Sequence, residues 1–167
     1  MPAIRDATLE DLPAIFAIYD EQVLHGTATF DTEPKPAAER REWVDAHPRE
    51  RYPVIVAEEG GAVVGWARLT PWSPRRAYAR TAENSVYVRK DARGRGAGRA
   101  LLEALVARAR AAGISVILAR VADGNPASLR LHEALGFRPV GTMRRVGEKF
   151  GRVLDVTLLD LHIDEGR

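Results

Sequence analysis

Hydrophobic residues recur along the chain with two periods, one typical of helices and the other of strands. Between Thr8 and Leu24 the apolar side chains are three or four residues apart, at Leu12, Ile15, Phe16, Tyr19 and Val23. This spacing predicts a helix with one buried face. Thr8 followed by Asp11 predicts that a variant of the capping box opens this helix.

The remaining segments alternate between strand and helix patterns. Strands are expected at residues 2–6, 53–70 as a hairpin turning at Gly60 and Gly61, 82–90, 114–122, part of 138–150, and 152–163; helices are expected at 36–48, 99–113 and 125–137, the last ending at Gly136. The strand-helix-strand order over residues 82–122 predicts a parallel pair. The sequence therefore predicts an α/β fold with a mixed, mostly antiparallel central sheet of about seven strands, about four flanking helices and one parallel β-α-β crossover.

Composition narrows the class of protein. The chain has 167 residues, of which 46% are hydrophobic, so we expect a single domain spanning residues 1–167. The net charge is only +2, which gives no overall indication of a nucleic-acid or membrane partner. There is no cysteine and the four histidines are far apart, so no metal site is expected. No signal sequence or membrane-length apolar run is evident, which favours a cytoplasmic protein.

A glycine-rich, basic stretch lies between a predicted strand and a predicted helix. It consists of Arg93, Gly94, Arg95, Gly96, Ala97, Gly98 and Arg99. The first N–H groups of a helix lack intrahelical partners, and glycine lets a ligand approach the backbone, so this pattern is typical of phosphate binding. The alternative is a tight turn with solvated arginines. The stretch is not a P-loop, because no G-K-[ST] follows, and it does not have the glycine spacing of a dinucleotide-binding fingerprint. It also differs from RGG-type RNA-binding segments, which are repeated and disordered.

The stretch VYVRKDARGRGAGRALLEAL resembles the acetyl-CoA signature of the GNAT superfamily of N-acetyltransferases, which is [RQ]-x-x-G-x-[GA]. Arg93, Gly96 and Gly98 match its fixed positions. The resemblance implies a GNAT-like fold in which backbone N–H groups of residues 94–99 hold the pyrophosphate of acetyl-CoA. It also implies that the main chain of Val86, Tyr87 and Val88 pairs with the pantetheine arm like an added strand.

The stretch NPASLRLHEALGF matches a second superfamily motif through Asn125, Ser128, His132, Gly136 and Phe137. His132 stands where most members of the superfamily have a tyrosine. This substitution points to a subgroup, and the chain resembles the phosphinothricin and L-amino-acid (methionine sulfoximine or sulfone) acetyltransferases. That resemblance covers nearly the whole chain. It also implies a homodimer, formed in part by the region around Lys149, Phe150 and Arg152.

Acetyl transfer to an amine needs a base for the ammonium proton and an acid for the leaving thiolate. Glu83, just before the cofactor-pairing segment, is the candidate base, and the resemblance implies the same role. His132 is a candidate for the acid or for a share of the base work. A backbone N–H near Val88 is expected to polarise the thioester, and direct attack in a ternary complex is the simplest route.

A small amino acid brings a carboxylate that arginines in the segment WSPRRAYAR could meet. The predicted acceptor-binding residues are Phe30, Trp72, Ser73, Arg75, Tyr78, Arg80, Glu83, Asn84 and Ser85. Aminoglycosides, polyamines and protein N-termini are alternative acceptors. A non-catalytic module that binds CoA or nucleic acid is the alternative from another class.

Overall fold

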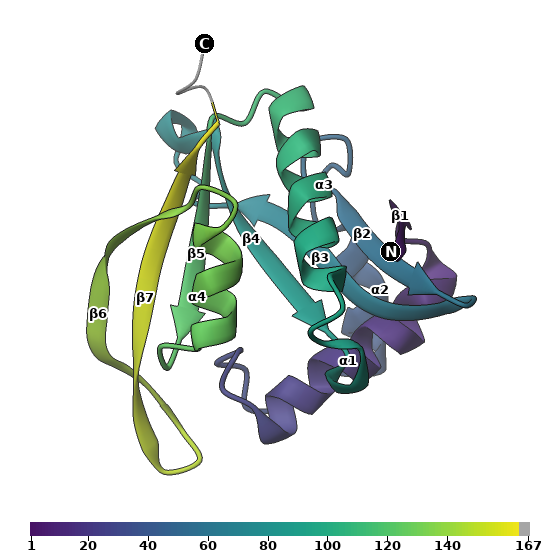
Figure 1. Ribbon diagram of the computed structural model, residues 1–167, viewed down its shortest axis with the longest axis horizontal. Helices are drawn as coiled ribbons and strands as arrows, with labels where there is room; N and C mark the ends of the chain where they lie inside the picture. The colour runs from purple at the N-terminus through teal and green to yellow at the C-terminus, as the bar shows by residue number, and fades with distance from the viewer. Residues whose placement is uncertain (164–167) are drawn as a thin grey trace.

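The computed structural model describes residues 1–163 and contains one seven-stranded sheet with four α-helices (Figure 1). In chain order the elements are β1 (Ala3–Asp6), α1 (Leu12–His25), α2 (Ala37–Asp45), β2 (Val54–Glu59), β3 (Ala62–Pro71), β4 (Thr81–Val88), α3 (Ala97–Ala111), β5 (Val116–Ala122), α4 (Pro126–Glu133), β6 (Arg138–Lys149) and β7 (Arg152–His162). The strand order is β1-β2-β3-β4-β5-β7-β6. Among the strands of residues 1–163, only β4 and β5 pair in parallel, so the predicted fold class and its crossover are confirmed.

The ends of several elements differ from the sequence-based expectation. The first helix begins as a 3-10 turn at Leu9–Asp11, and its Thr8 backbone N–H donates to the Asp11 carboxylate at 2.8 Å, as the capping pattern predicted. The fourth α-helix ends at Glu133, three residues before Gly136, whose φ of 89° then turns the chain into β6. A short 3-10 turn, Lys90–Ala92, replaces the expected end of the strand over 82–90.

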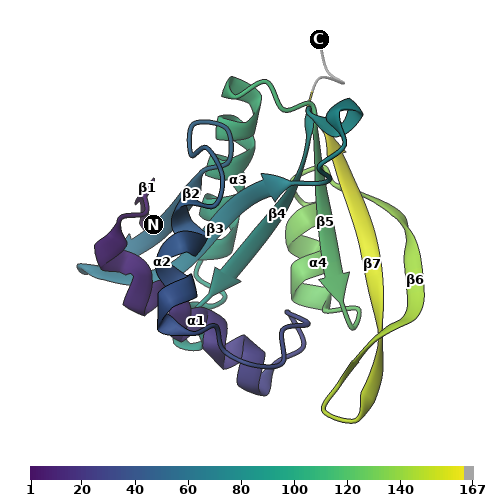
Figure 2. The same ribbon diagram turned by 180° about the vertical axis from the view of Figure 1, so that it is seen from behind.

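The helices cover the two faces of the sheet unequally. Figure 1 shows α3 and α4 in front of the sheet, and the reverse view in Figure 2 shows α1 and α2 on the opposite face. On the α3 face the core includes the fully buried Leu101, Leu102, Leu105 and Ile117. On the α1 face a smaller core gathers Ile15, Phe16, Val56 and Trp66, as the helical spacing of the first segment predicted.

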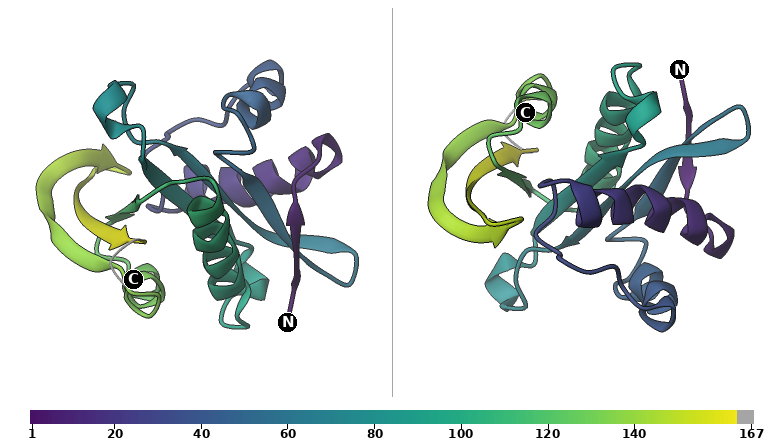
Figure 3. Two further views of the ribbon diagram at one scale, coloured as in Figure 1. Left: turned by 90° about the horizontal axis from the view of Figure 1, so that it is seen from above. Right: turned by 90° about the horizontal axis from the view of Figure 1, so that it is seen from below.

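The two central strands separate along their length. β4 and β5 are in register only from Thr81↔Val116 to Glu83↔Leu118, and beyond that point they diverge into a V that is visible in Figure 1. The long β6–β7 hairpin curves around the outer side of this opening (Figure 3). The fold thus leaves a gap in the middle of the sheet, and this gap is where the candidate site lies.

Candidate active site

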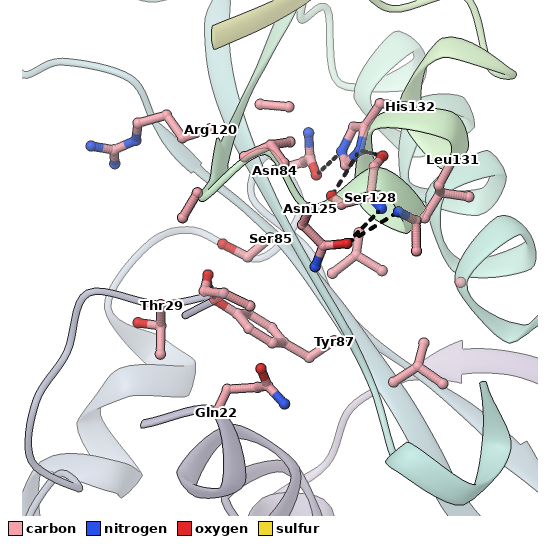
Figure 4. A pocket seen from close by; sticks show the side chains of 18 of the residues that line it. Gln22, Thr29, Asn84, Ser85, Tyr87, Arg120, Asn125, Ser128, Leu131 and His132 are labelled. Atoms are coloured by element: carbon pink, nitrogen blue, oxygen red, sulfur yellow. Dashed lines mark hydrogen bonds between the residues drawn. The ribbon is translucent and has the colours of Figure 1, made fainter. Parts of the chain in front are cut away.

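A cavity of about 970 Å³ occupies the gap between β4 and β5. Its walls come from the end of α1 and the loop after it, from β4, β5, the start of α3, α4 and the β6–β7 hairpin (Figure 4). Most residues predicted as site residues line it: Phe30, Glu83, Asn84, Ser85, Val86, Tyr87, Val88, Arg93, Gly94, Gly96, Gly98, Arg99, Asn125, Ser128 and His132. Residues as far apart in the sequence as Phe30 and His132 therefore meet in one space.

Seven of the predicted site residues do not line this cavity: Trp72, Ser73, Arg75, Tyr78, Arg80, Arg95 and Ala97. The segment from residue 72 to 80 precedes β4, whereas the cavity begins at Glu83, two residues into that strand. Trp72 nevertheless contacts the cavity wall indirectly, because the Arg120 guanidinium lies 5.7 Å from its ring centre. A role for this segment in acceptor binding stays a prediction.

The start of α3 has the geometry expected of an anion site. Gly94 and Gly96 have positive φ values of 75° and 89°, a region that side chains other than glycine rarely occupy. Gly96 is the N-cap, and the first intrahelical bond runs from the Ala100 N–H to its carbonyl at 3.0 Å. The N–H groups of residues 97–99 thus have no acceptor within the helix and are free to meet phosphate oxygens.

The arginines of this stretch are tied loosely to nearby groups. Arg93 donates from Nε to the Val88 carbonyl at 3.0 Å, Arg99 pairs with Glu103 at 2.8 Å, and Arg95 lies 3.5 Å from Glu59. Arg95 and Arg99 are more than half exposed, so their pairing contributes little and can be exchanged for a ligand phosphate. The helix start and its arginines together fit a pyrophosphate.

The strand before this stretch has an open edge toward the cavity. β4 pairs with β3 from Ala82 to Val88, but with β5 only as far as Glu83. Within residues 1–163, no strand pairs with the cavity-facing edge of residues 84–88. An extended ligand arm can therefore add to that edge through main-chain hydrogen bonds.

Neighbouring residues of β4 face opposite sides of the sheet. Glu83 pairs with Leu118, so it shares a face with Leu118 and with Arg120 two residues later. Asn84 points to the other face, where α4 lies, and its Nδ2 donates to the Leu118 carbonyl at 3.1 Å. The two candidate catalytic side chains, Glu83 and His132, consequently approach the gap from opposite faces.

The Glu83 carboxylate forms a two-pronged ion pair with Arg120. Arg120 Nε donates to Oε1 at 2.5 Å and Nη2 donates to Oε2 at 2.7 Å. The Glu83 side chain is only 14% exposed, whereas that of Arg120 is 52% exposed. The carboxylate is therefore held in place at the cavity wall by a cation that remains open to the solvent.

His132 is buried on α4 with both ring nitrogens facing acceptors. Nδ1 donates to the Ser128 carbonyl at 2.8 Å, and Nε2 lies 3.1 Å from Oδ1 of Asn84, contacts drawn in Figure 4. The ring also packs edge-on against Phe137, with centroids 4.9 Å apart. Burial lowers the pKa of His132, and the hydrogen bond to the Ser128 carbonyl opposes that shift.

The opposite wall holds polar residues that the sequence did not indicate: Tyr19, Gln22, Thr29, Asp31 and Arg120. The Tyr19 hydroxyl donates to Asp31 at 2.7 Å and lies 2.8 Å from the Thr29 hydroxyl, and burial raises the pKa of Tyr19 above its ordinary value. Tyr19 was counted from the sequence among the apolar positions of the first helix, so its hydroxyl group was not considered. The other four carry no local motif, and only the tertiary fold brings them together.

Among residues 1–163, no three or more histidine, aspartate or glutamate side chains are grouped so that they could hold a metal ion. Over the same residues, no helix has the length and apolar character needed to cross a membrane.

Comparison with curated proteins finds relatives along nearly the whole chain. It is 46% identical over 166 residues to the L-methionine sulfoximine/L-methionine sulfone acetyltransferase of Pseudomonas paraeruginosa, covering 99% of this chain and 96% of the relative. It is 42% identical to the phosphinothricin N-acetyltransferase of Alcaligenes faecalis, covering 98% of this chain and 82% of that protein.

Comparison with solved structures also finds acetyltransferases. A phosphinothricin acetyltransferase from Sinorhizobium meliloti, solved in complex with acetyl-CoA, superposes with a TM-score of 0.93 at 39% identity, covering 96% of this chain and 88% of that one. Residues 7–137 match the Acetyltransferase (GNAT) family. The chain therefore belongs to the GNAT family of acetyltransferases and is an enzyme that uses acetyl-CoA.

Proposed function

We propose that this enzyme acetylates the α-amine of a small L-amino acid or analogue, such as methionine sulfoximine, methionine sulfone or phosphinothricin. The observation that supports this most is the cavity between β4 and β5, which joins an anion-binding helix start to a wall carrying Glu83, Asp31 and Arg120. The relatives named above act on compounds of this class. A small amino acid carries an ammonium and a carboxylate, and so it matches a cavity wall with both acidic and basic side chains.

Glu83 is the proposed base. A primary amine is mostly protonated at neutral pH and cannot attack until it loses that proton. Glu83 is a carboxylate at the cavity wall, on the face opposite α4. Held by Arg120, it can accept the proton directly or through one water, after which the amine nitrogen bonds to the acetyl carbon and the carbon-sulfur bond breaks.

His132 is the proposed proton donor to the departing thiolate, since it lines the same cavity from the α4 side. The N–H groups along the open edge of β4, around Val88, would stabilise the developing oxyanion. The chain has no cysteine to form an acyl-enzyme, and direct attack in a ternary complex needs none.

A homodimer of single-domain chains is the proposed assembly. The β6–β7 hairpin exposes large apolar side chains, with Val140, Met143, Val146, Phe150 and Val153 each between 41% and 56% exposed. Met143 and Val146 also line the cavity, so a partner on this hairpin would cover one side of the site. A cytoplasmic location stays a prediction.

A thiol-release assay with DTNB, in which acetyl-CoA and a panel of amines are supplied, tests the proposed acceptor class. We expect CoA release with methionine sulfoximine, methionine sulfone or phosphinothricin, and replacement Glu83→Gln should lower kcat by about 100-fold or more because it removes the base. Release only with polyamines, aminoglycosides or peptides would exclude small amino acids as acceptors. An unchanged rate in Glu83→Gln would show that another group removes the proton.

A further inference from the structure

Arg120 lies at the border between the cavity and solvent, on the same face of the sheet as Glu83. Figure 4 shows its side chain extending away from Asn84 and His132. Among the described residues that line the cavity, it is the one basic side chain on this face. The other arginines lining the cavity are Arg93 in the turn before α3, Arg99 in the first turn of α3, and Arg130 on α4.

The Arg120 guanidinium has one edge occupied and one edge available. Nε and one N–H of Nη2 hold the Glu83 carboxylate. A guanidinium carries five N–H donors, and the remaining three, on Nη1 and Nη2, have no hydrogen-bond partner among residues 1–163. Nη1 and Nη2 together form the fork that binds a carboxylate with two parallel hydrogen bonds.

Two contacts fix the orientation of that fork. The ion pair to Glu83 holds one edge, and the guanidinium carbon lies over the Trp72 ring, 5.7 Å from the ring centre. An arginine already ordered by its own protein loses less side-chain entropy when it binds a ligand. The available edge is thus preorganised.

The charges around the fork complement a zwitterion. Glu83 and Asp31 both line the cavity and suit an ammonium group, whereas Arg120 suits a carboxylate. In an α-amino acid these two groups are separated by a single carbon. A carboxylate bound to Nη1 and Nη2 would therefore keep the amine close to Glu83, which the same guanidinium holds on its other edge.

We propose that Arg120 binds the α-carboxylate of the acceptor through Nη1 and Nη2, and so selects amines that carry a neighbouring carboxylate. This inference rests on the proposed function, because it assumes that the acceptor is a small amino acid. Arg120 would act as a bridge between substrate and base. The residues predicted for this task from the sequence, Arg75, Arg76 and Arg80, do not line the cavity.

The test compares an amino acid with its own carboxamide, for example methionine sulfone with methionine sulfone amide, in the native enzyme and in Arg120→Met. In the native enzyme we expect kcat/KM for the acid to exceed that for the amide by about 50-fold. In Arg120→Met the preference should fall to within a few-fold, because only the acid loses a partner. Arg110→Met, which removes an exposed charge on α3, is the matched control and should keep the native preference.

The outcomes separate this inference from the proposed function. If acid and amide are equally good substrates of the native enzyme, Arg120 does not bind the carboxylate and this inference is wrong. The proposed function would still stand, because amino acids would be acetylated. Equal losses for acid and amide in Arg120→Met would assign it a structural role in holding Glu83 and overturn the inference. A collapse of the preference in Arg75→Met instead would move the subsite to that residue. If no amino acid is acetylated at all, the proposed function fails and this inference fails with it.

Discussion

His132 has both ring nitrogens directed at oxygen atoms that accept hydrogen bonds. The Asn84 amide is fixed because its Nδ2 donates to the Leu118 carbonyl, so Oδ1 must face His132 Nε2. A neutral ring with its proton on Nδ1 leaves two acceptors facing each other 3.1 Å apart, whereas a protonated ring donates to both. Burial favours the neutral ring, and the hydrogen bond to the Ser128 carbonyl opposes that effect. The Asn84 oxygen, placed to accept from Nε2, also suits the protonated ring.

Replacement of Asn84 by leucine should lower the pKa of His132 further, because the oxygen that favours the protonated ring is lost. Asn84→Asp should raise that pKa, since a carboxylate favours imidazolium. NMR titration of the four histidines, with His132→Gln as the assignment standard, measures the shift. The pH profile of kcat/KM then separates the two roles. If its descending limb moves to lower pH in Asn84→Leu, His132 acts as an acid; if its ascending limb moves to lower pH, His132 acts as a base. An unmoved profile would mean that His132 exchanges no proton in the reaction.

Asp11 shows a second effect of pairing at the level of one side chain. Arg5 donates to its carboxylate at 2.7 and 2.8 Å and lowers the pKa of Asp11 to about 2. Since this pKa is below the ordinary value, the pair stabilises the fold above about pH 4, and the stabilisation is lost as the pH falls toward 2. Asp11→Asn should lower the free energy of unfolding by about 1–2 kcal/mol at pH 7 and by much less near pH 2, as measured by urea denaturation. Equal losses at both pH values would contradict the shifted pKa.

At the scale of elements, α3 begins and ends at glycines with similar backbone geometry. Gly96 has a φ of 89° at its N-terminus and Gly113 has a φ of 73° just after its C-terminus. A Cβ on either glycine would meet no atom within 4 Å, so the left-handed backbone is the main cost of a substitution in both. Only Gly96 lines the cavity.

The pair Gly96→Ala and Gly113→Ala separates strain from cofactor binding. Both should lower the free energy of unfolding by about 1 kcal/mol. Only Gly96→Ala should raise the KM for acetyl-CoA, by about tenfold or more, because its methyl group occupies the approach to the N–H groups of α3. Thermal unfolding and initial rates measure the two effects. If the KM rises equally in both variants, or in neither, the helix start does not hold the pyrophosphate.

Local patterns predicted the elements well and the site in part. The order of strands and helices, the turn at Gly60 and Gly61, and the parallel pair follow from periodicity and from turn chemistry. The motif residues of α3 and α4 were found because their spacing within one element carries the signal. Arg120 and Asp31 were missed, since an alternating residue of a strand and a loop residue gain their meaning only from the partners that the fold supplies.

At the scale of the whole molecule, the β6–β7 hairpin carries large apolar side chains that stay exposed within residues 1–163. If two chains associate through it, light scattering should give a mass of about twice the 18.4 kDa chain. Val153→Asp should shift the mass toward that of the single chain, because a charge in an apolar interface is costly. Leu9→Asp is the control. Leu9 is exposed to a similar extent and lies just after β1, at the other end of the sheet from β6, so its replacement should leave the mass unchanged. A native enzyme that is monomeric at micromolar concentration would exclude the dimer.

The buried Lys149 connects the β6–β7 hairpin to α1 and the loop after it. Its Nζ donates to the carbonyls of Gln22 and Thr29, both at 2.9 Å, across about 120 residues of sequence. Beside it, a Cβ on Gly147 would overlap the Phe30 ring, so the hairpin and the loop after α1 fit closely. During synthesis on the ribosome, this loop therefore receives its lysine only after nearly the whole chain has emerged. The start of α3 and the open edge of β4, where acetyl-CoA is proposed to bind, precede Lys149 in the chain, so the contacts of the hairpin with the loop after α1 are among the last of the cavity wall to form.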